Sequence, residues 1–109
     1  MSFDHGLSRQ TIEHIHEVFE RYKVVEKAVL YGSRAKGTFR EGSDIDLTLF
    51  GDVDFKTLSQ IVDDIDELML PYLFDISVYS SLTNNDLRGL IDRVGKIIYQ
   101  RTWSMRKEP

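Results

Sequence analysis

Two aspartates in the pattern Asp-x-Asp, Asp44 and Asp46, are the side chains of this sequence best placed to do chemistry. Residues two apart in a β-strand point to the same face, with their Cα atoms about 6.6 Å apart. Two Mg²⁺ ions that act on a phosphoryl group lie about 3.5 to 4 Å apart, and one carboxylate can bridge them while the other holds one ion. The pair therefore predicts a metal site for phosphoryl transfer, provided that residues 45–50 form a strand.

A glycine and serine pair, Gly32 and Ser33, precedes the aspartates, with ten residues between Ser33 and Asp44. Glycine lets the backbone come close to a ligand, while a serine hydroxyl and the amides at the start of a short helix can bind phosphate oxygens. The nearby cations, which the sequence does not rank, are Arg34, Lys36 and Arg40. This stretch is typical of a loop that binds phosphates.

A third carboxylate is expected on the strand predicted over residues 73–79, where Asp75 interrupts the apolar residues Phe74 and Ile76. Transfer of a nucleotide to a hydroxyl needs a group that accepts or steers the hydroxyl proton. Asp75 is the candidate for that role. The alternative is that Asp75 simply faces water on an edge strand.

Hydrophobic periodicity predicts helices and strands that position these residues. The most regular pattern starts at Asp54, which can cap a helix, and ends before Pro71. The predicted elements are a helix over residues 8–22 capped by Ser8, a strand over 27–31, a short helix in the glycine loop, a strand over 45–50, a helix from 54 to about 69, a strand over 73–79, a helix that starts at Asn84 or Asn85 and closes at Gly95, and a strand over 96–99.

The order of these elements predicts how the candidate residues meet. Gly32 ends the first strand and Asp44 begins the second, so they come together only if the two strands run antiparallel, which the short connection allows. The helix from residue 54 is a crossover of the length that joins parallel strands, and it returns Asp75 to the edge that carries Asp46. The sequence therefore predicts an α/β (α+β) fold, a small mixed sheet backed by helices.

Length, composition and charge narrow the class of protein. The 109 residues suit a single domain over 1–109, with a core over about 26–100 and a loose tail over 101–109. Without cysteine, any metal must be held by oxygen or imidazole, which favours hard cations. The net charge of −4 argues against direct nucleic-acid binding. Because the sequence has no long apolar run and no basic, apolar leader, we expect a cytoplasmic protein without a membrane partner.

Three further groups of residues are expected to take no part in chemistry. The acidic residues of the long helix form its solvated face, because the apolar stripe runs between them; they are Asp63, Asp64, Asp66 and Glu67. His14 and His16 are two apart on a helix and cannot share a ligand. The polar tail could contact another protein, but a frayed terminus is the simpler expectation; its candidate residues are Trp103, Arg106 and Lys107.

The segments LYGSRAKG, Leu30 to Gly37, and SDIDL, Ser43 to Leu47, resemble the signature of the minimal nucleotidyltransferases in the DNA polymerase beta superfamily. The resemblance implies the nucleotidyltransferase fold, ATP as substrate and two Mg²⁺ ions as cofactors. The catalytic and metal-binding residues that it implies are Asp44, Asp46 and Asp75, and the nucleotide-binding residues are Gly32, Ser33, Arg34, Lys36 and Ser43. Lys36 stands where an arginine is common, which keeps the charge but loses bidentate phosphate geometry.

The resemblance also implies a reaction, the transfer of AMP from ATP to a hydroxyl group. A chain of this length has no room for an acceptor-binding domain, so the acceptor is expected on another polypeptide. Family members of this size resemble the antitoxins that add AMP to a helical HEPN-domain ribonuclease toxin, and a hetero-oligomer with such a toxin is expected. Two alternatives stay open: a binding module that neutralises a HEPN partner by covering it, and nucleotidyl transfer to a small-molecule antibiotic. Three carboxylates in one site favour the enzyme, because a pure binder gains nothing from their repulsion.

Overall fold

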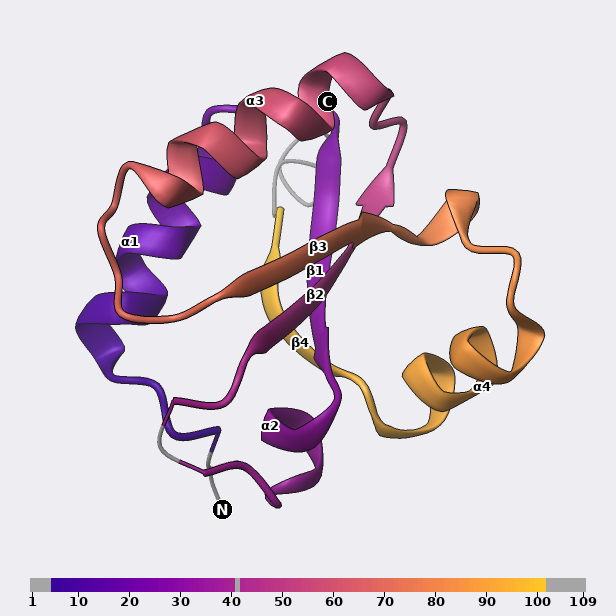
Figure 1. The fold of residues 1–109 in the computed structure, drawn as a ribbon. Coiled ribbons are helices and arrows are strands. Elements are labelled where there is room, and N and C mark those ends of the chain that lie inside the picture. Colours follow the sequence, from indigo (N-terminus) through magenta and orange to yellow (C-terminus); the bar gives the residue numbers. More distant parts are fainter. Residues whose placement is uncertain (1–4, 41, 102–109) are drawn as a thin grey trace, which may run out of the picture.

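The computed structural model describes residues 5–40 and 42–101 (Figure 1). Its elements, in chain order, are α1 (Arg9–Glu20), β1 (Val25–Tyr31), α2 (Ser33–Lys36), β2 (Ile45–Gly51), α3 (Phe55–Asp66), β3 (Phe74–Val78), the 3-10 turn η1 (Tyr79–Ser81), α4 (Asn85–Val94) and β4 (Lys96–Gln100). Each predicted helix and strand is present, with ends that differ by a few residues. The tail residues Trp103, Arg106 and Lys107 lie outside the described residues.

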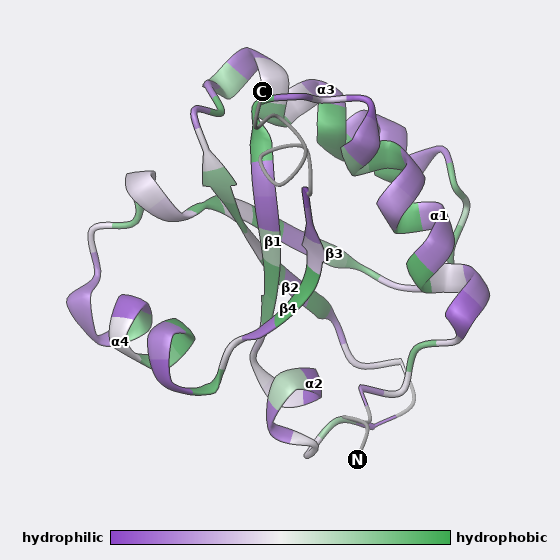
Figure 2. Cartoon of the chain, turned by 180° about the vertical axis from the view of Figure 1, so that it is seen from behind, coloured by the Kyte–Doolittle hydropathy of each residue, from purple (hydrophilic) through white to green (hydrophobic). Residues whose placement is uncertain are grey.

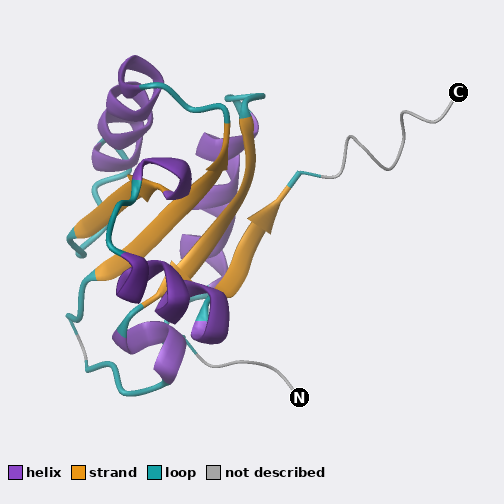
Figure 3. Ribbon diagram, turned by 90° about the vertical axis from the view of Figure 1, so that its right-hand side faces the viewer, coloured by secondary structure: helices purple, strands orange, loops and turns teal. Residues whose placement is uncertain are grey.

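The four strands form one mixed sheet in the order β3-β2-β1-β4, and they lie side by side in Figure 3. Strand β1 is antiparallel to both β2 and β4, whereas β2 and β3 are parallel and are joined through α3. These directions confirm the predicted topology and the α/β class. The end of β1 therefore lies beside the start of β2, and the start of β3 lies on the other side of β2.

Helices cover the two faces of the sheet unequally. Helices α1 and α3 lie together on one face, and Figure 2 shows hydrophobic and hydrophilic turns alternating along both of them, as expected for helices with one buried side. The main core lies on this side and includes the fully buried Ile15, Phe19, Leu47 and Ile61. The opposite face carries α4 and a smaller cluster centred on Val29, Tyr31 and Ile91.

The predicted caps of the long helices are confirmed by hydrogen bonds. Side-chain oxygens at the N-caps accept from backbone amides three residues later: Ser8 from Thr11, Asp54 from Thr57, and Asn84 from Leu87. Helix α3 ends at Asp66 instead of near residue 69, because Met69 adopts a left-handed conformation (φ 58°) that leads the chain away from the helix.

The acidic residues of α3 behave as the sequence predicts, with one exception. Asp63, Asp66 and Glu67 are exposed. Asp64 instead joins α3 to α1, because it accepts hydrogen bonds from the hydroxyl of Tyr22 (2.5 Å) and from Arg21 (3.3 Å).

Among the described residues, no helix has the length and apolar character needed to cross a bilayer.

Arg101, which the sequence assigns to the loose tail, is held in place. Its guanidinium donates to the carbonyls of Phe19, Glu20 and Tyr22 at the end of α1 and to that of Val25 at the start of β1. A cation at this point also complements the negative end of the helix dipole. At its C-terminal end, the described fold therefore extends one residue past the expected core, to Arg101.

Candidate functional site

The candidate carboxylates lie on the sheet face that α4 only partly covers. Tyr31 is the register partner of Asp46 across β1 and β2, and Asp46 is the register partner of Asp75 across β2 and β3. Directly paired residues point to the same face of a sheet, so these three side chains form one row. Asp44 precedes β2 and is exposed, as is Asp75, whereas Asp46 is half-buried. The structure thus brings Asp44, Asp46 and Asp75 to one end of the sheet, as the sequence predicts.

The electrostatics of the row centre on Asp46. Burial raises the pKa of its carboxyl group above the usual value, and the negative charges of Asp75 and then Asp44 raise the pKa further. A bound cation would reduce this repulsion between the carboxylates. Carboxylate oxygens are the ligands that hard divalent ions prefer. The donor set therefore fits Mg²⁺.

The aspartates do not form a closed cage. The described residues contain no group of three or more His, Cys, Asp or Glu side chains arranged to enclose a metal ion. Mg²⁺ is usually held by one or two carboxylates together with substrate phosphates and water, so an open site suits a metal that binds with a nucleotide.

The glycine loop is built directly against Asp46. Gly32 ends β1 with φ 80°, a conformation that side chains rarely adopt, and a Cβ atom added to it would lie 2.3 Å from Oδ2 of Asp46. Only glycine leaves room for this carboxylate. Ser33 begins the short helix α2 directly after Gly32, and Figure 1 shows α2 at the end of β1. The predicted phosphate loop and the predicted metal ligands are therefore adjacent.

Arg34 does not lie where a nucleotide-binding arginine is needed. Its side chain is 2% exposed; Nη1 donates to the carbonyl of His5 (2.9 Å), and Nε and Nη2 both donate to that of Ser43 (3.2 and 3.0 Å). The guanidinium also lies between the rings of Phe39 and Tyr72, 5.1 and 5.0 Å from their centroids. The prediction of a direct nucleotide contact for Arg34 is corrected: this cation joins three loops from inside.

Ser43 has a similar role in the loop. Its carbonyl accepts from Arg34, and its hydroxyl accepts from the backbone amide of Arg40 (2.7 Å), which fixes the turn before Asp44. The side chains of Lys36 and Arg40 are exposed beside α2. Of the predicted cations, these two are accessible to a phosphate group.

Tyr31 is a residue of the site that the sequence analysis did not single out. Its ring is buried, and burial raises the pKa of the phenol, a hydrogen bond with Ser77 lowers it, and the charges of Asp75 and Asp46 raise it again. Ser77 in turn donates to the hydroxyl of Thr48 (3.1 Å). A chain of hydroxyl groups thus lies beside the carboxylate row. The available signal was the position of Tyr31, at the end of a strand directly before Gly32.

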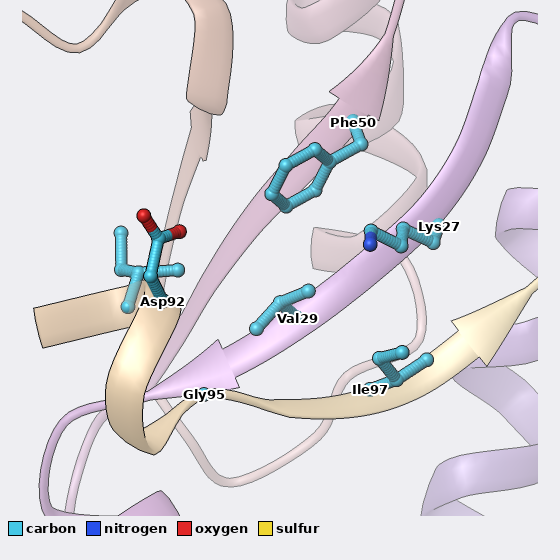
Figure 4. Close-up of a pocket in the computed structure, with 7 residues that line it drawn as sticks. Lys27, Val29, Phe50, Asp92, Gly95 and Ile97 are labelled. Carbon is cyan, nitrogen blue, oxygen red and sulfur yellow. The ribbon is translucent and has the colours of Figure 1, made fainter. Parts of the chain in front are cut away.

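A pocket of about 220 Å³ opens further along the same face (Figure 4). It lies between α4 and strands β1, β2 and β4, and its lining includes Lys27, Val29, Phe50 and Ile97. The Lys27 ammonium is 4.6 Å from the centre of the Phe50 ring, and that ring stacks on Tyr79 at 4.4 Å. The pocket shares no lining residue with the glycine loop or the carboxylates.

The family described as "Polymerase beta, Nucleotidyltransferase" matches residues 13–103, which include the glycine loop, the Asp-x-Asp pair and Asp75. The chain belongs to this nucleotidyltransferase family. The match extends from α1 past the end of β4, so the whole described sheet lies within it.

Relatives of known structure share the fold of this nucleotidyltransferase. The crystal structure of a toxin–antitoxin pair with AMP-PNP gives a TM-score of 0.67 at 18% identity, over 90% of this chain and 77% of the other. The complex of a tri-AMPylated HEPN toxin with an MNT antitoxin from Shewanella oneidensis gives 0.64 at 14% identity, over 91% and 77% of the two chains.

A curated relative shares more of its sequence over a shorter stretch. The protein of Methanocaldococcus jannaschii named "Putative protein adenylyltransferase MJ0604" is 42% identical over 48 residues, which are 44% of this chain. The matched part spans 45% of that relative's length.

The contact between Gly32 and Asp46 can be tested against a matched glycine. Gly37 also has a positive φ (83°), but a Cβ added there would meet nothing within 4 Å. We expect Gly37→Ala to lose about 1 to 2 kcal/mol of stability because of its left-handed backbone, and Gly32→Ala to lose more because its methyl group would also meet the Asp46 carboxylate, both measured by chemical denaturation. Only Gly32→Ala should also abolish the increase in Tm that Mg²⁺-ATP causes, because the methyl group displaces the Asp46 carboxylate. Equal nucleotide binding by the two variants would contradict this geometry.

The buried role of Arg34 predicts a contrast with its neighbour Lys36. Arg34→Met leaves the carbonyls of His5 and Ser43 without their donors, and hydrogen bonds from charged groups each contribute about 1.5 to 3 kcal/mol. The free energy of unfolding, measured in urea, should therefore fall by at least about 2 kcal/mol. Lys36→Met, at an exposed position, should change it by less than about 0.5 kcal/mol. If both variants were as stable as the wild type, the loops would not depend on this guanidinium.

Proposed function

We propose that this chain transfers AMP from ATP to a hydroxyl group on another protein, with a HEPN-domain toxin as the partner that it modifies. The observation that carries the proposal is the placement of the half-buried Asp46 between Gly32 and Asp75. This placement makes neighbours of the loop proposed to bind phosphates, the two carboxylates proposed to bind metal and a third carboxylate. Membership of the nucleotidyltransferase family supports the same reaction class.

The residues divide the work of this reaction. The acceptor oxygen forms a bond to the α-phosphorus of ATP, the bond from that phosphorus to the pyrophosphate oxygen breaks, and pyrophosphate leaves. Ser33 and the amides of α2 bind the triphosphate, and the exposed Lys36 and Arg40 lie beside it. Asp75, exposed at the start of the edge strand, takes the proton from the acceptor hydroxyl.

The metal-binding carboxylates explain why the site is acidic. Asp44 and Asp46 would hold Mg²⁺, which, when bound, neutralises charge that develops on the phosphoryl oxygens. Without a cation, three carboxylates beside a triphosphate would repel the substrate.

The choice of a protein acceptor rests on the relatives. The toxin in the Shewanella oneidensis complex is tri-AMPylated, and the related toxin–antitoxin pair binds AMP-PNP. The name of the Methanocaldococcus jannaschii relative refers to protein adenylylation. A binding module that silences the toxin by covering it alone is the second candidate, since antitoxins of this fold occur in complexes with their toxins.

The metal-binding role predicts the effect of removing one charge from the row. Asp46→Asn keeps the shape of the side chain but weakens the hold on Mg²⁺, so AMP transfer should fall at least about 100-fold. Asp63→Asn, on the exposed face of α3, is the matched control and should keep wild-type activity. The measurement is intact-mass spectrometry of a HEPN-domain protein from the same genome after incubation with ATP and Mg²⁺. An Asp46→Asn variant with near wild-type transfer would refute the site.

The proton-accepting role of Asp75 predicts that binding and turnover separate. Asp75→Asn should still show an increase in Tm with Mg²⁺-ATP that EDTA removes, because Asp44, Asp46 and the loop remain. Its transfer of AMP should nevertheless slow sharply. If Asp75→Asn and the wild type silence the toxin equally, and no nucleotide is added in either case, covering of the toxin is the better account.

A further inference from the structure

Strand β3 forms one edge of the sheet, and its outer side is unpaired among the described residues. The amide of Ile45 donates to the carbonyl of Leu73 (2.9 Å), and Ile45 is the register partner of Phe74. In a parallel ladder this pattern directs the backbone groups of alternate residues away from the neighbouring strand. In β3 these outward residues are Phe74, Ile76 and Val78. Their amide and carbonyl groups offer a template for another strand.

Apolar surface flanks this edge on both sides of its centre. A groove of about 360 Å³ lies between α3 and the second half of β3, and Phe55, Leu58 and Leu82 contribute to its lining. Phe55 is 82% exposed. Leu73, directly before the first half of the strand, is 74% exposed. The edge therefore has a hollow at one end and a protruding apolar side chain at the other.

We propose that the β3 edge pairs with β3 of a second copy of this chain, antiparallel about a two-fold axis at Ile76. Ile76 then faces Ile76 of the second copy, and Phe74 faces Val78, so the apolar side chains of both strands form one row. In these pairs the outward backbone groups of the two strands exchange hydrogen bonds. A two-fold contact of this kind uses the same patch on both copies.

The charges of β3 suit this register. Asp75 faces Ser77 of the second copy in a pair without backbone hydrogen bonds, where the Cα atoms are about 4.5 Å apart and side chains are closest. A register shifted by two residues would instead set Asp75 against Asp75 of the second copy, and like charges directly opposite each other are destabilising. The sequence Phe-Asp-Ile-Ser-Val can therefore pair with a second copy of itself in this register without setting two aspartates opposite each other.

The apolar surfaces also match under the two-fold axis. Antiparallel pairing brings the first half of each β3 strand, with Leu73 before it, alongside the groove at the second half of the other strand. Each copy thus inserts its protruding side chain beside the hollow of its partner. The second copy would also place its Ser77 beside Asp75, at the border of the candidate site.

The first test measures association of the purified chain by sedimentation velocity over a range of concentrations. The wild type should form a dimer, and Phe55→Glu should weaken the dimer at least about tenfold because it places a charge in the apolar contact. Ile97→Glu is the matched control, since Ile97 is 54% exposed on β4 at the opposite edge, and it should leave association unchanged. A wild-type chain that stays monomeric at about 0.5 mM would overturn the proposal, as would equal weakening by both variants.

The second test reads the register directly, because the chain has no cysteine of its own. Asp75→Cys and Ser77→Cys chains, mixed and oxidised, should form a disulfide between them, since a Cα separation of about 4.5 Å lies within the range for this bond. Either variant alone should form few disulfides, because the cysteines of its two copies lie in different cross-strand pairs and do not face each other. Equal crosslinking in the mixture and in the separate samples would exclude this register.

Discussion

The buried guanidinium of Arg34 is the interaction on which the geometry of the candidate site depends. It is held among three loops: the segment before α1 through His5, the turn before β2 through Ser43, and the loop before β3 through the ring of Tyr72. These loops precede, respectively, the helix that backs the sheet, the Asp-x-Asp pair and Asp75. A charge inside a protein is costly unless its donors are satisfied, so the loops can close only in the arrangement that satisfies them.

The strand directions of the mixed sheet then bring the candidate carboxylates side by side. An antiparallel pair places the end of β1 next to the start of β2, and the parallel crossover through α3 returns the chain to the same end. Neither an all-parallel nor an all-antiparallel arrangement of these strands would set Gly32, Asp46 and Asp75 side by side with such short connections. The candidate carboxylates come from β2, the position before it and β3, whereas the connection between β1 and β2 supplies the internal cation and the proposed phosphate contacts.

The sequence predicted the elements well because the apolar periods are regular and the caps are strong. It also predicted that Asp44, Asp46 and Asp75 converge, because that follows from topology alone. It misassigned Arg34, since a cation beside a glycine loop has the same sequence pattern whether it points outward to phosphate or inward to carbonyls. Tyr31 escaped notice because its position depends on the pairing of β1 with β2 and on the hydroxyl of Ser77. Burial and tertiary contact decide both cases, and local sequence carries little of either.

The tight fit of Gly32 against Asp46 has a consequence for what a shared motif can reveal. Within LYGSRAKG, Gly32 leaves room for the Asp46 carboxylate, Arg34 holds loops together and Gly37 ends helix α2. At least three residues of the motif therefore determine backbone structure. The presence of this motif in a sequence therefore indicates how the backbone turns around a carboxylate. The motif says much less about which molecule accepts the transferred nucleotide. Information about the acceptor must be sought in the surfaces around the motif, such as the one along α4.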